Sequence, residues 1–206
     1  MKALSIQFKV TMLVVISLVL TAVVSTLVVA FLMHNEATER LEGTRAVMTR
    51  EKVEALSDKV KIAYHVVNSF YEALQNDPDK TDPSVVKAYQ EKAKIAIKKL
   101  RFGEDGYFWI NDFTPKMVMH PIKPALDGAD LSQSKDPKGK FLFNEMVDVA
   151  TKNGKGVVNY MWEKPGFDTP QAKISFVEGF KPWGWIIGTG VYADDIDALV
   201  AKEKQK

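Results

Sequence analysis

The sequence contains no cysteine and only three histidines among its 206 residues. Without a thiol, disulfide cross-links, thiol catalysis and cysteine-ligated zinc sites are all excluded. His34, His65 and His120 lie on widely separated segments, so a three-histidine metal centre is not expected either. We therefore predict no metal and no cofactor for this chain.

Motifs of catalysis and nucleotide binding are also missing. The sequence has no His-Glu-x-x-His pair, no phosphate loop and no Gly-x-Ser-x-Gly elbow. Residues 153–156 have the wrong spacing for a phosphate loop and predict a turn, while residues 188–190 lie inside a strand pattern. The pair Asp194-Asp195 is more typical of a helix start than of an acid/base couple. The sequence therefore predicts a protein that is not an enzyme, and an extracytoplasmic hydrolase is kept only as an alternative.

Neither sign of charge dominates the composition. Lys and Arg number 28, Asp and Glu number 26, and the formal net charge is +2. The basic residues are scattered, and no basic stripe interleaves with aromatic residues as in nucleic-acid-binding proteins. The C-terminal lysines Lys202, Lys204 and Lys206 are typical of a solvated helix end. We predict no nucleic-acid partner.

One long apolar run stands out near the N-terminus. Residues 10–33 contain no charged residue, and as a helix they would span about 36 Å at ~1.5 Å per residue. That exceeds the ~30 Å hydrocarbon core of a bilayer. Lys2 and Lys9 precede the run, and Glu36 follows it, so the positive-inside rule predicts a cytoplasmic segment over residues 1–9. We expect a single-pass protein of the cytoplasmic (inner) membrane whose remaining residues face the periplasm or the exterior.

A cleaved signal peptide is the alternative interpretation of this run. Signal peptides usually carry an apolar region of only ~7–15 residues, which is shorter than the run seen here. A weak small-residue cleavage site nevertheless exists near Val28-Val29-Ala30.

Two helices are predicted after the apolar run. Between Val53 and Leu74, apolar residues recur at spacings of three and four, which indicates one apolar stripe along a long helix. We expect this helix to pack on a sheet and residues 36–55 to form a homodimer contact, because a helix leaving the membrane has little else to pack against. Asp82 followed by Pro83 predicts the N-cap of a second helix that runs to about Leu100.

Beyond Gly103 the apolar period changes from helical spacing to two. Short strands separated by turns are expected, and neighbouring hairpins require antiparallel pairing. A long loop over residues 121–138, a short amphipathic helix over residues 141–152 and a final helix from Asp194 accompany them. The predicted fold class is α+β, with a membrane helix running into a long helix, a second helix and an antiparallel sheet of about five strands. The predicted strands are Tyr107–Ile110, Met117–His120, Val157–Glu163, Lys173–Phe180 and Trp185–Tyr192.

Five segments in this order resemble the single Cache domain (type 2), the extracytoplasmic sensory domain of methyl-accepting chemotaxis proteins and sensor kinases. They are Arg101–Ile110, Met119–Pro121, Gly154–Gly156 leading to Tyr160–Pro165, Lys173–Phe176, and Trp183–Tyr192. The resemblance implies a PAS-like sheet and a role in sensing small molecules for chemotaxis or signal transduction. With it, we expect a sensory domain over residues 34–200 and a C-terminal helix end over residues 201–206. Family members usually continue into a second membrane helix and a cytoplasmic signalling module, so the sequence is expected to be either the sensory end of a longer receptor or a stand-alone anchored sensor.

Strand alternation suggests where a binding site could form. Tyr107 and Trp109 share a face of one strand, Tyr160 and Trp162 share a face of another, and Lys173 begins the next. Aromatic walls with a few polar tips suit small ligands. The predicted ligand-binding residues are Tyr107, Trp109, His120, Tyr160, Trp162, Lys173 and Arg101.

The resemblance also implies a ligand class, because related domains often bind short carboxylates such as C2–C4 acids. In that interpretation Lys173 supplies the cationic donor, and Arg101 is a second candidate whose planar fork suits a carboxylate. Arg101 could equally cap the end of the preceding helix, where a cation is favoured. The aromatic residues could equally be core, and the whole domain could be a structural module that serves a partner receptor without a ligand of its own.

Overall fold

The computed structural model describes residues 5–203 of the chain. It separates into two compact units, Met1–Ala46 and Val47–Lys206. Residues 1–4 of the predicted cytoplasmic segment, including Lys2, lie outside the described residues. So do Lys204 and Lys206 of the predicted C-terminal helix end.

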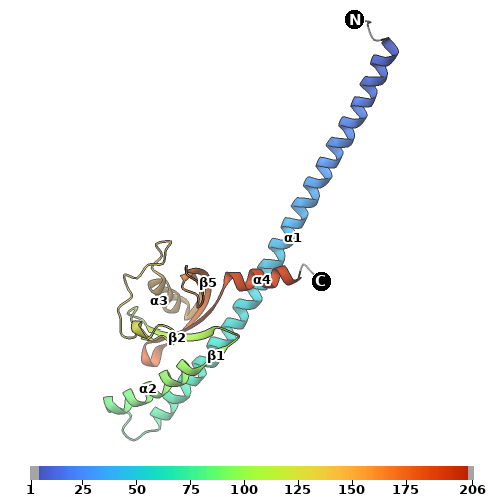
Figure 1. The fold of residues 1–206 in the computed structure, drawn as a ribbon. Helices are drawn as coiled ribbons and strands as arrows, with labels where there is room; N and C mark the ends of the chain where they lie inside the picture. The colour runs from blue at the N-terminus through green and yellow to red at the C-terminus, as the bar shows by residue number, and fades with distance from the viewer. Residues whose placement is uncertain (1–4, 204–206) are drawn as a thin grey trace. The chain divides into compact units, whose positions relative to one another are not determined.

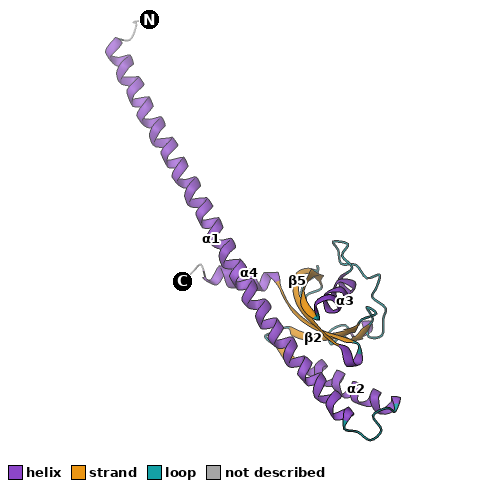
Figure 2. Cartoon of the chain, turned by 180° about the vertical axis from the view of Figure 1, so that it is seen from behind, coloured by secondary structure: helices purple, strands orange, loops and turns teal. Residues whose placement is uncertain are grey.

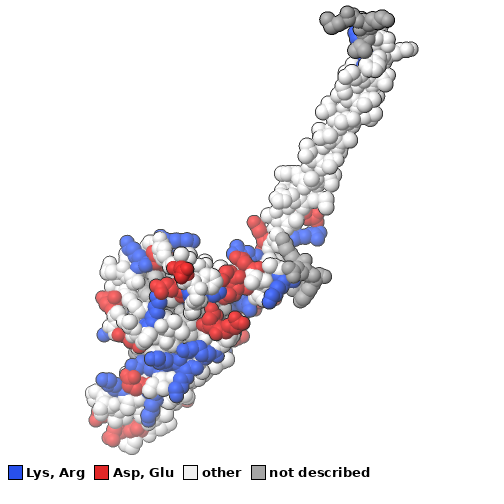
Figure 3. All heavy atoms as spheres, viewed as in Figure 1, with Lys and Arg blue, Asp and Glu red and all other residues white. Residues whose placement is uncertain are grey.

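The first unit consists of the N-terminal part of helix α1 (Ile6–Gln75). Among the described residues, α1 is the one helix that is long and apolar enough to cross a membrane. Its side chains carry no charge between Lys9 and Glu36, so this stretch is drawn white in Figure 3. Its large apolar side chains are exposed, for example Leu18 at 65% and Leu27 at 64%. A surface of this kind is unusual for a helix surrounded by water.

The second unit is built on one antiparallel sheet (Figure 1). In the described part of the chain the strand order is β1-β2-β6-β5-β4, and β3 pairs with β2 outside this path. The strands are β1 (Arg101–Phe102), β2 (Gly106–Asp112), β3 (Met117–Met119), β4 (Lys155–Trp162), β5 (Gln171–Phe180) and β6 (Trp185–Tyr192). The predicted α+β class with an antiparallel sheet of about five strands is confirmed. The two-residue strand β1 was not predicted.

Helices cover the two faces of the sheet. On one face, α2 (Pro83–Lys99) and the C-terminal part of α1 pack against β2 and β6, as Figure 2 shows from behind. Val67 of α1, Ile97 of α2 and Ile110 of β2 are fully buried there. On the other face lies α3 (Leu142–Asn153). The predicted apolar stripe of α1 therefore packs on the sheet.

Local sequence signals explain where several elements begin and end. The side chain of Asp82 accepts a hydrogen bond from the backbone N–H of Ser84 at 2.7 Å, which makes Asp82 the N-cap of α2 as predicted. At the C-terminus of α3, Gly154 has φ 76°, a conformation that a residue with a Cβ rarely adopts. Two short 3-10 helices, Pro124–Leu126 and Lys181–Trp183, occupy connections.

Helix α4 (Ala193–Glu203) follows β6 without an intervening loop. Its first turn is held by Lys164 from the β4–β5 connection. The Nζ atom of Lys164 lies 2.8 Å from Oδ2 of Asp194 and 2.7 Å from Oδ1 of Asp195. Lys164 is 92% buried by this arrangement, since only 8% of its side chain is exposed.

Candidate functional site

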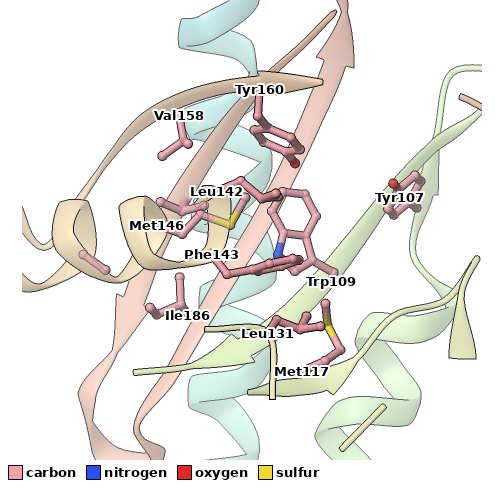
Figure 4. Close-up of a cluster of buried hydrophobic side chains, with 12 residues drawn as sticks. Tyr107, Trp109, Met117, Leu131, Leu142, Phe143, Met146, Val158, Tyr160 and Ile186 are labelled. Carbon is pink, nitrogen blue, oxygen red and sulfur yellow. The ribbon is translucent and has the colours of Figure 1, made fainter. Parts of the chain in front are cut away.

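A small cavity lies on the sheet face that α3 covers. Its volume is about 10 Å³, which is room for roughly one water molecule. It is lined by side chains from β2, β4, α3 and the residue that follows β3. They are Tyr107, Trp109, His120, Phe143, Tyr160 and Trp162. Figure 4 shows several of these side chains converging on the same region, with Trp109 between Tyr160 and Phe143 in this view.

Strand pairing explains why these residues meet. Lys173 on β5 is paired with Tyr160 on β4 and with Tyr192 on β6, so the three form one row across the sheet. Side chains directly opposite each other in an antiparallel ladder point to the same face. This row places the Lys173 side chain on the same face of the sheet as Tyr160, which lines the cavity.

Lys173 is the most unusual residue of the site. Only 2% of it is exposed, and its Nζ donates a hydrogen bond to the hydroxyl of Tyr107 at 2.7 Å. The Nζ atom also lies 4.2 Å from the ring centre of Tyr107, 4.9 Å from that of Tyr192 and 5.5 Å from that of Trp109. Such ring faces stabilise a cation.

The charge of Lys173 is nevertheless not compensated by an anion. In the described part of the chain, Lys173 forms no ion pair with any carboxylate, and Tyr107 accepts only one of its three N–H donors. Burial lowers the pKa of Lys173 to about 7, and the charge of Asp105 acts in the opposite direction. A buried ammonium group without a partner is unfavourable, and a bound anion would relieve this cost.

His120 is buried beside Lys173 in a defined tautomer. Its Nδ1 accepts hydrogen bonds from the backbone N–H groups of Lys123 at 2.9 Å and Ile122 at 3.3 Å. The neutral ring must therefore carry its proton on Nε2, which can act as a donor. Burial lowers the pKa of His120 to about 3, and the nearby charges of Lys173 and Lys123 act in the same direction. His120 is thus a neutral hydrogen-bond donor at any physiological pH.

The two tyrosines of the cavity keep their protons. Burial raises the pKa of Tyr107 to about 12 and raises the pKa of Tyr160 still further. The hydroxyl of Tyr160 shares a hydrogen bond of 3.0 Å with Oγ of Ser175. Both phenols are therefore neutral groups that can donate to an acceptor in the cavity.

Trp109 and Trp162 form apolar walls that are buried to different degrees. Trp109 is buried, and its indole Nε1 donates to Oδ1 of Asn111 at 3.1 Å, so its orientation is fixed. Trp162 is half-buried, and its ring contacts Phe143 edge-to-face at 5.9 Å. The Nζ atom of Lys123 lies 5.1 Å from the Trp162 ring centre and pairs with Glu163. Trp162 is therefore the wall that borders the protein surface.

A groove of about 440 Å³ runs along the outer side of Trp162. Lys123, Lys135 and Glu163 are among its charged lining residues. The small cavity and the larger groove thus share one indole as their boundary.

The structure does not bring Arg101 into this site. Its side chain is exposed, and NH1 donates to the backbone carbonyls of Lys98 and Leu100, both at 2.7 Å. These carbonyls lie at the C-terminal end of α2, so Arg101 caps that helix end, which was the alternative to ligand binding. The other six predicted residues do lie together.

Three side chains at this site were not predicted. Phe143 lines the cavity from α3, Ser175 holds the Tyr160 hydroxyl, and Tyr192 stacks beside the Lys173 ammonium. Strand alternation could have suggested Ser175 from Lys173, two residues earlier on β5. The other two depend on the β5–β6 register and on the packing of α3, which are long-range features.

The arrangement suits binding better than chemistry. It offers a buried cation, neutral donors from His120 and two tyrosines, and aromatic walls that exclude water. Such a set can hold a small anion and fix its orientation. Among the described residues, no group of three or more His, Cys, Asp or Glu side chains could hold a metal ion.

Comparison with known proteins identifies relatives with named functions. The methyl-accepting chemotaxis protein McpP of Pseudomonas putida is 53% identical over 116 residues, which are 56% of this chain and 21% of McpP. The sensor histidine kinase MctS of Rhizobium johnstonii is 25% identical over 198 residues, which are 96% of this chain and 41% of MctS. The chain therefore spans less than half the length of these curated relatives.

Solved structures of similar fold are sensor domains. A periplasmic sensor domain of a chemotaxis protein is 39% identical with a TM-score of 0.65, and the match covers 70% of this chain and 97% of that one. A Cache chemosensory domain whose structure concerns carboxylic acid recognition is 42% identical with a TM-score of 0.64, covering 71% and 97%. Residues 33–206 match the model of a protein family described as Cache domain. This match spans more than half of the chain, and the chain therefore belongs to the Cache domain family of sensory domains.

Proposed function

We propose that this Cache domain binds a short-chain carboxylate in the cavity beside Lys173. The observation that supports the proposal most strongly is the buried Lys173 ammonium, which has no anionic partner in the described residues. A carboxylate would accept hydrogen bonds from Lys173, from Nε2 of His120 and from the Tyr107 hydroxyl. The aromatic walls would contact its short apolar chain.

The size of the cavity favours small acids. At about 10 Å³ it must widen to admit even acetate, and each added methylene requires more displacement of buried side chains. Trp162 is the half-buried wall, so its outward movement toward the groove is the least costly way to make room. We expect acids of two to four carbons to bind and longer acids to bind progressively more weakly.

The size of the ligand also limits its affinity. Acetate and propionate have about four and five non-hydrogen atoms, and the best small ligands gain at most ~1.5 kcal/mol per atom. The binding free energy then cannot much exceed about 7.5 kcal/mol, which corresponds to a dissociation constant of a few micromolar. A sensor of this kind works between micromolar and millimolar concentrations of its ligand.

Thermal unfolding against a panel of C2–C4 carboxylates, amino acids and amines tests the proposal. We expect one or more carboxylates to raise the melting temperature in a saturable manner, and Lys173→Ala to abolish the effect. Stabilisation by amines but not by carboxylates would refute it, because an amine would not compensate the buried cation. No shift with any compound would favour the alternative of a structural domain that acts through a partner receptor.

The proposal extends to the membrane. Residues 10–33 would form a transmembrane helix, with residues 1–9 cytoplasmic and the Cache domain over residues 34–200 in the periplasm or outside the cell. The uncharged, exposed surface of α1 in this stretch supports it. Because the chain has no cysteine, Ala37→Cys in intact cells can be tested with a membrane-impermeant thiol reagent. Labelling of Ala37→Cys but not of Ser5→Cys is expected, and the reverse pattern would contradict the orientation.

We also propose a homodimer through residues 36–55 of α1. Val47 is 46% exposed in the described chain, although it is apolar and lies in the part of α1 that this contact would use. Val47→Cys is expected to form a disulfide-linked dimer in membranes under mild oxidation, whereas Lys87→Cys on α2 should not. Equal cross-linking at both positions would indicate random collision instead of a defined contact.

A further inference from the structure

The centre of β6 contains two glycines that its backbone conformation does not require. Gly188 and Gly190 are not among the described residues with positive φ. Glycine in a strand interior lowers stability relative to alanine, because it loses more conformational freedom on folding and has no side chain to pack. Close approach of another group is the remaining physical reason for glycine at such positions.

At Gly188 the approaching group is the indole of Trp109. The two residues are paired across β2 and β6. A Cβ at position 188 would lie 2.4 Å from Cζ2 and 2.7 Å from Cε2 of Trp109. These separations are far below van der Waals contact, so the indole rests directly on bare backbone.

At Gly190 the approaching groups belong to β5. A Cβ there would lie 3.0 Å from Cε of Lys173 and 2.3 Å from Oγ of Ser175. It would also lie 2.7 Å from the backbone oxygen of Ile174, which cannot move without disturbing the β5–β6 ladder. The stem of Lys173 thus passes over Gly190, and the Ser175 hydroxyl that holds Tyr160 occupies the space beside it.

We propose that Gly188 and Gly190 are positioning residues for the ligand site, forming a bare floor that sets the places of the Lys173 ammonium and the Trp109 indole. The floor lets the ammonium lie low enough to reach the Tyr107 hydroxyl and to remain surrounded by rings. It also keeps the indole flat, so that the cavity above it fits only a small anion. The part of this inference that concerns ligand choice rests on the proposed carboxylate function. The part that concerns Lys173 does not.

The test compares Gly190→Ala with the wild type in the full chain, purified in detergent. The first measurement needs no ligand. It is an NMR pH titration of lysines labelled with ¹³C at Cε, in which the Lys173 signal is identified as the one that is absent from Lys173→Met. We expect the Lys173 midpoint to move upward by at least one pH unit in Gly190→Ala, because the displaced ammonium regains water. The groups that face Lys173, which are Tyr107, Tyr160, Tyr192, His120 and Asp105, are unchanged in this variant.

The second measurement is calorimetric titration with sodium acetate and sodium propionate. We expect Gly190→Ala to weaken the binding of both acids by at least tenfold. We expect Gly188→Ala to change the ratio of the two affinities, because the added Cβ tilts the Trp109 ring. Gly156→Ala is the matched control: it also lies inside a strand, and its Cβ would meet the Val149 side chain at 2.8 Å, outside the cavity lining. The control should lose stability but keep both the Lys173 midpoint and the acetate affinity.

An unchanged Lys173 midpoint in Gly190→Ala would overturn the inference, whatever acetate does. If the Lys173 midpoint shifts in Gly190→Ala but the wild-type protein binds neither acid, the positioning role stands and the carboxylate proposal is refuted. If Gly190→Ala does not fold, the double variant Ser175→Ala/Gly190→Ala removes the 2.3 Å contact, and its Lys173 midpoint decides in the same way.

Discussion

At the scale of single residues, Lys173 dominates the energetics of the site. Its ammonium is buried among three aromatic rings, and within residues 5–203 its hydrogen-bond acceptor is the phenol oxygen of Tyr107. The folded pKa of about 7 lies below the ordinary value of 10.5. The charged form is therefore penalised in the folded state, in full below pH 7, and the penalty is relieved as the pH rises from 7 towards 10.5. The charged form of Lys173 thus lowers the stability of the folded domain, whereas the proposed carboxylate binding requires that charge.

Replacing Lys173 with methionine should separate the effect of this residue on stability from its effect on ligand binding. We expect Lys173→Met to raise the free energy of unfolding at pH 6 by about 1–4 kcal/mol, since an apolar chain of similar shape replaces an uncompensated charge. The gain should shrink towards pH 10, where the wild-type lysine is neutral. Urea unfolding at the two pH values measures this, and calorimetry should show that carboxylate binding is lost. A variant that is less stable than the wild type at pH 6 would contradict the prediction.

The affinity for a carboxylate should depend on pH with a defined sign. Below pH 7, Lys173 is already charged and the acid is ionised, so the dissociation constant should be nearly flat between about pH 5.5 and 6.5. Above pH 7 the free lysine is neutral and must take up a proton on binding. The dissociation constant should then rise by up to about tenfold per pH unit. Calorimetric titrations from pH 5.5 to 9 test this, and an affinity that rises with pH above 7 would exclude Lys173 as the cationic partner.

At the scale of elements, the link between Lys164 and α4 is the interaction that can be tested most directly. Lys164 is almost completely buried, whereas the carboxylates of Asp194 and Asp195 remain 39% and 46% exposed. Hydrogen bonds to charged groups in such a setting contribute more than those of an exposed pair. The contact joins the β4–β5 connection to the first turn of α4.

Lys164→Met should loosen α4 without unfolding the sheet. We expect amide hydrogen exchange over residues 193–203 to accelerate about tenfold or more, while β5 and β6 keep their protection. Lys152→Met is the control, because the Lys152–Asp148 pair on α3 is 70% and 66% exposed and should contribute little. Equal acceleration in both variants, or none in Lys164→Met, would show that the ion pairs do not hold α4.

Some of these elements can be predicted from local sequence patterns, and others depend on long-range pairing. Helix α2 begins where Asp82 and Pro83 indicate, and the β4–β5 and β5–β6 hairpins follow from alternation and short turns. The pairing of β2 with β6 joins segments some 80 residues apart, for example Trp109 with Gly188, and no local pattern encodes it. That pairing places Trp109 on the glycine floor. Six predicted site residues lie together because alternation sorts faces correctly. Arg101 lies elsewhere because it directly follows the end of α2 and its side chain donates to the backbone carbonyls there.

At the scale of the whole molecule, every residue that lines the cavity belongs to the second unit. The core on the other side of the sheet includes residues of α1 after position 47, such as Leu56, Val60 and Ala63, which are fully buried. The proposed ligand site should therefore depend on the C-terminal part of α1 and not on its N-terminal part.

A fragment of residues 47–206 should fold and bind on its own. We expect cooperative thermal unfolding and carboxylate affinities within about threefold of those of the full chain in detergent, measured by circular dichroism and calorimetry. A second fragment of residues 76–206 lacks the α1 side chains that cover the sheet and should not unfold cooperatively. Failure of the longer fragment to bind, while the full chain binds, would show that the first unit contributes to the site.

The junction at Tyr192 has a consequence for communication out of the domain. Its ring forms a side of the Lys173 surroundings, its hydroxyl donates to the carbonyl of Glu163 at 2.7 Å, and the next residue begins α4. One peptide bond therefore separates a residue beside Lys173 from the helix that follows the sheet. Because no loop lies between them, a shift of the Tyr192 backbone on binding of the proposed ligand would reorient the first turn of α4 directly.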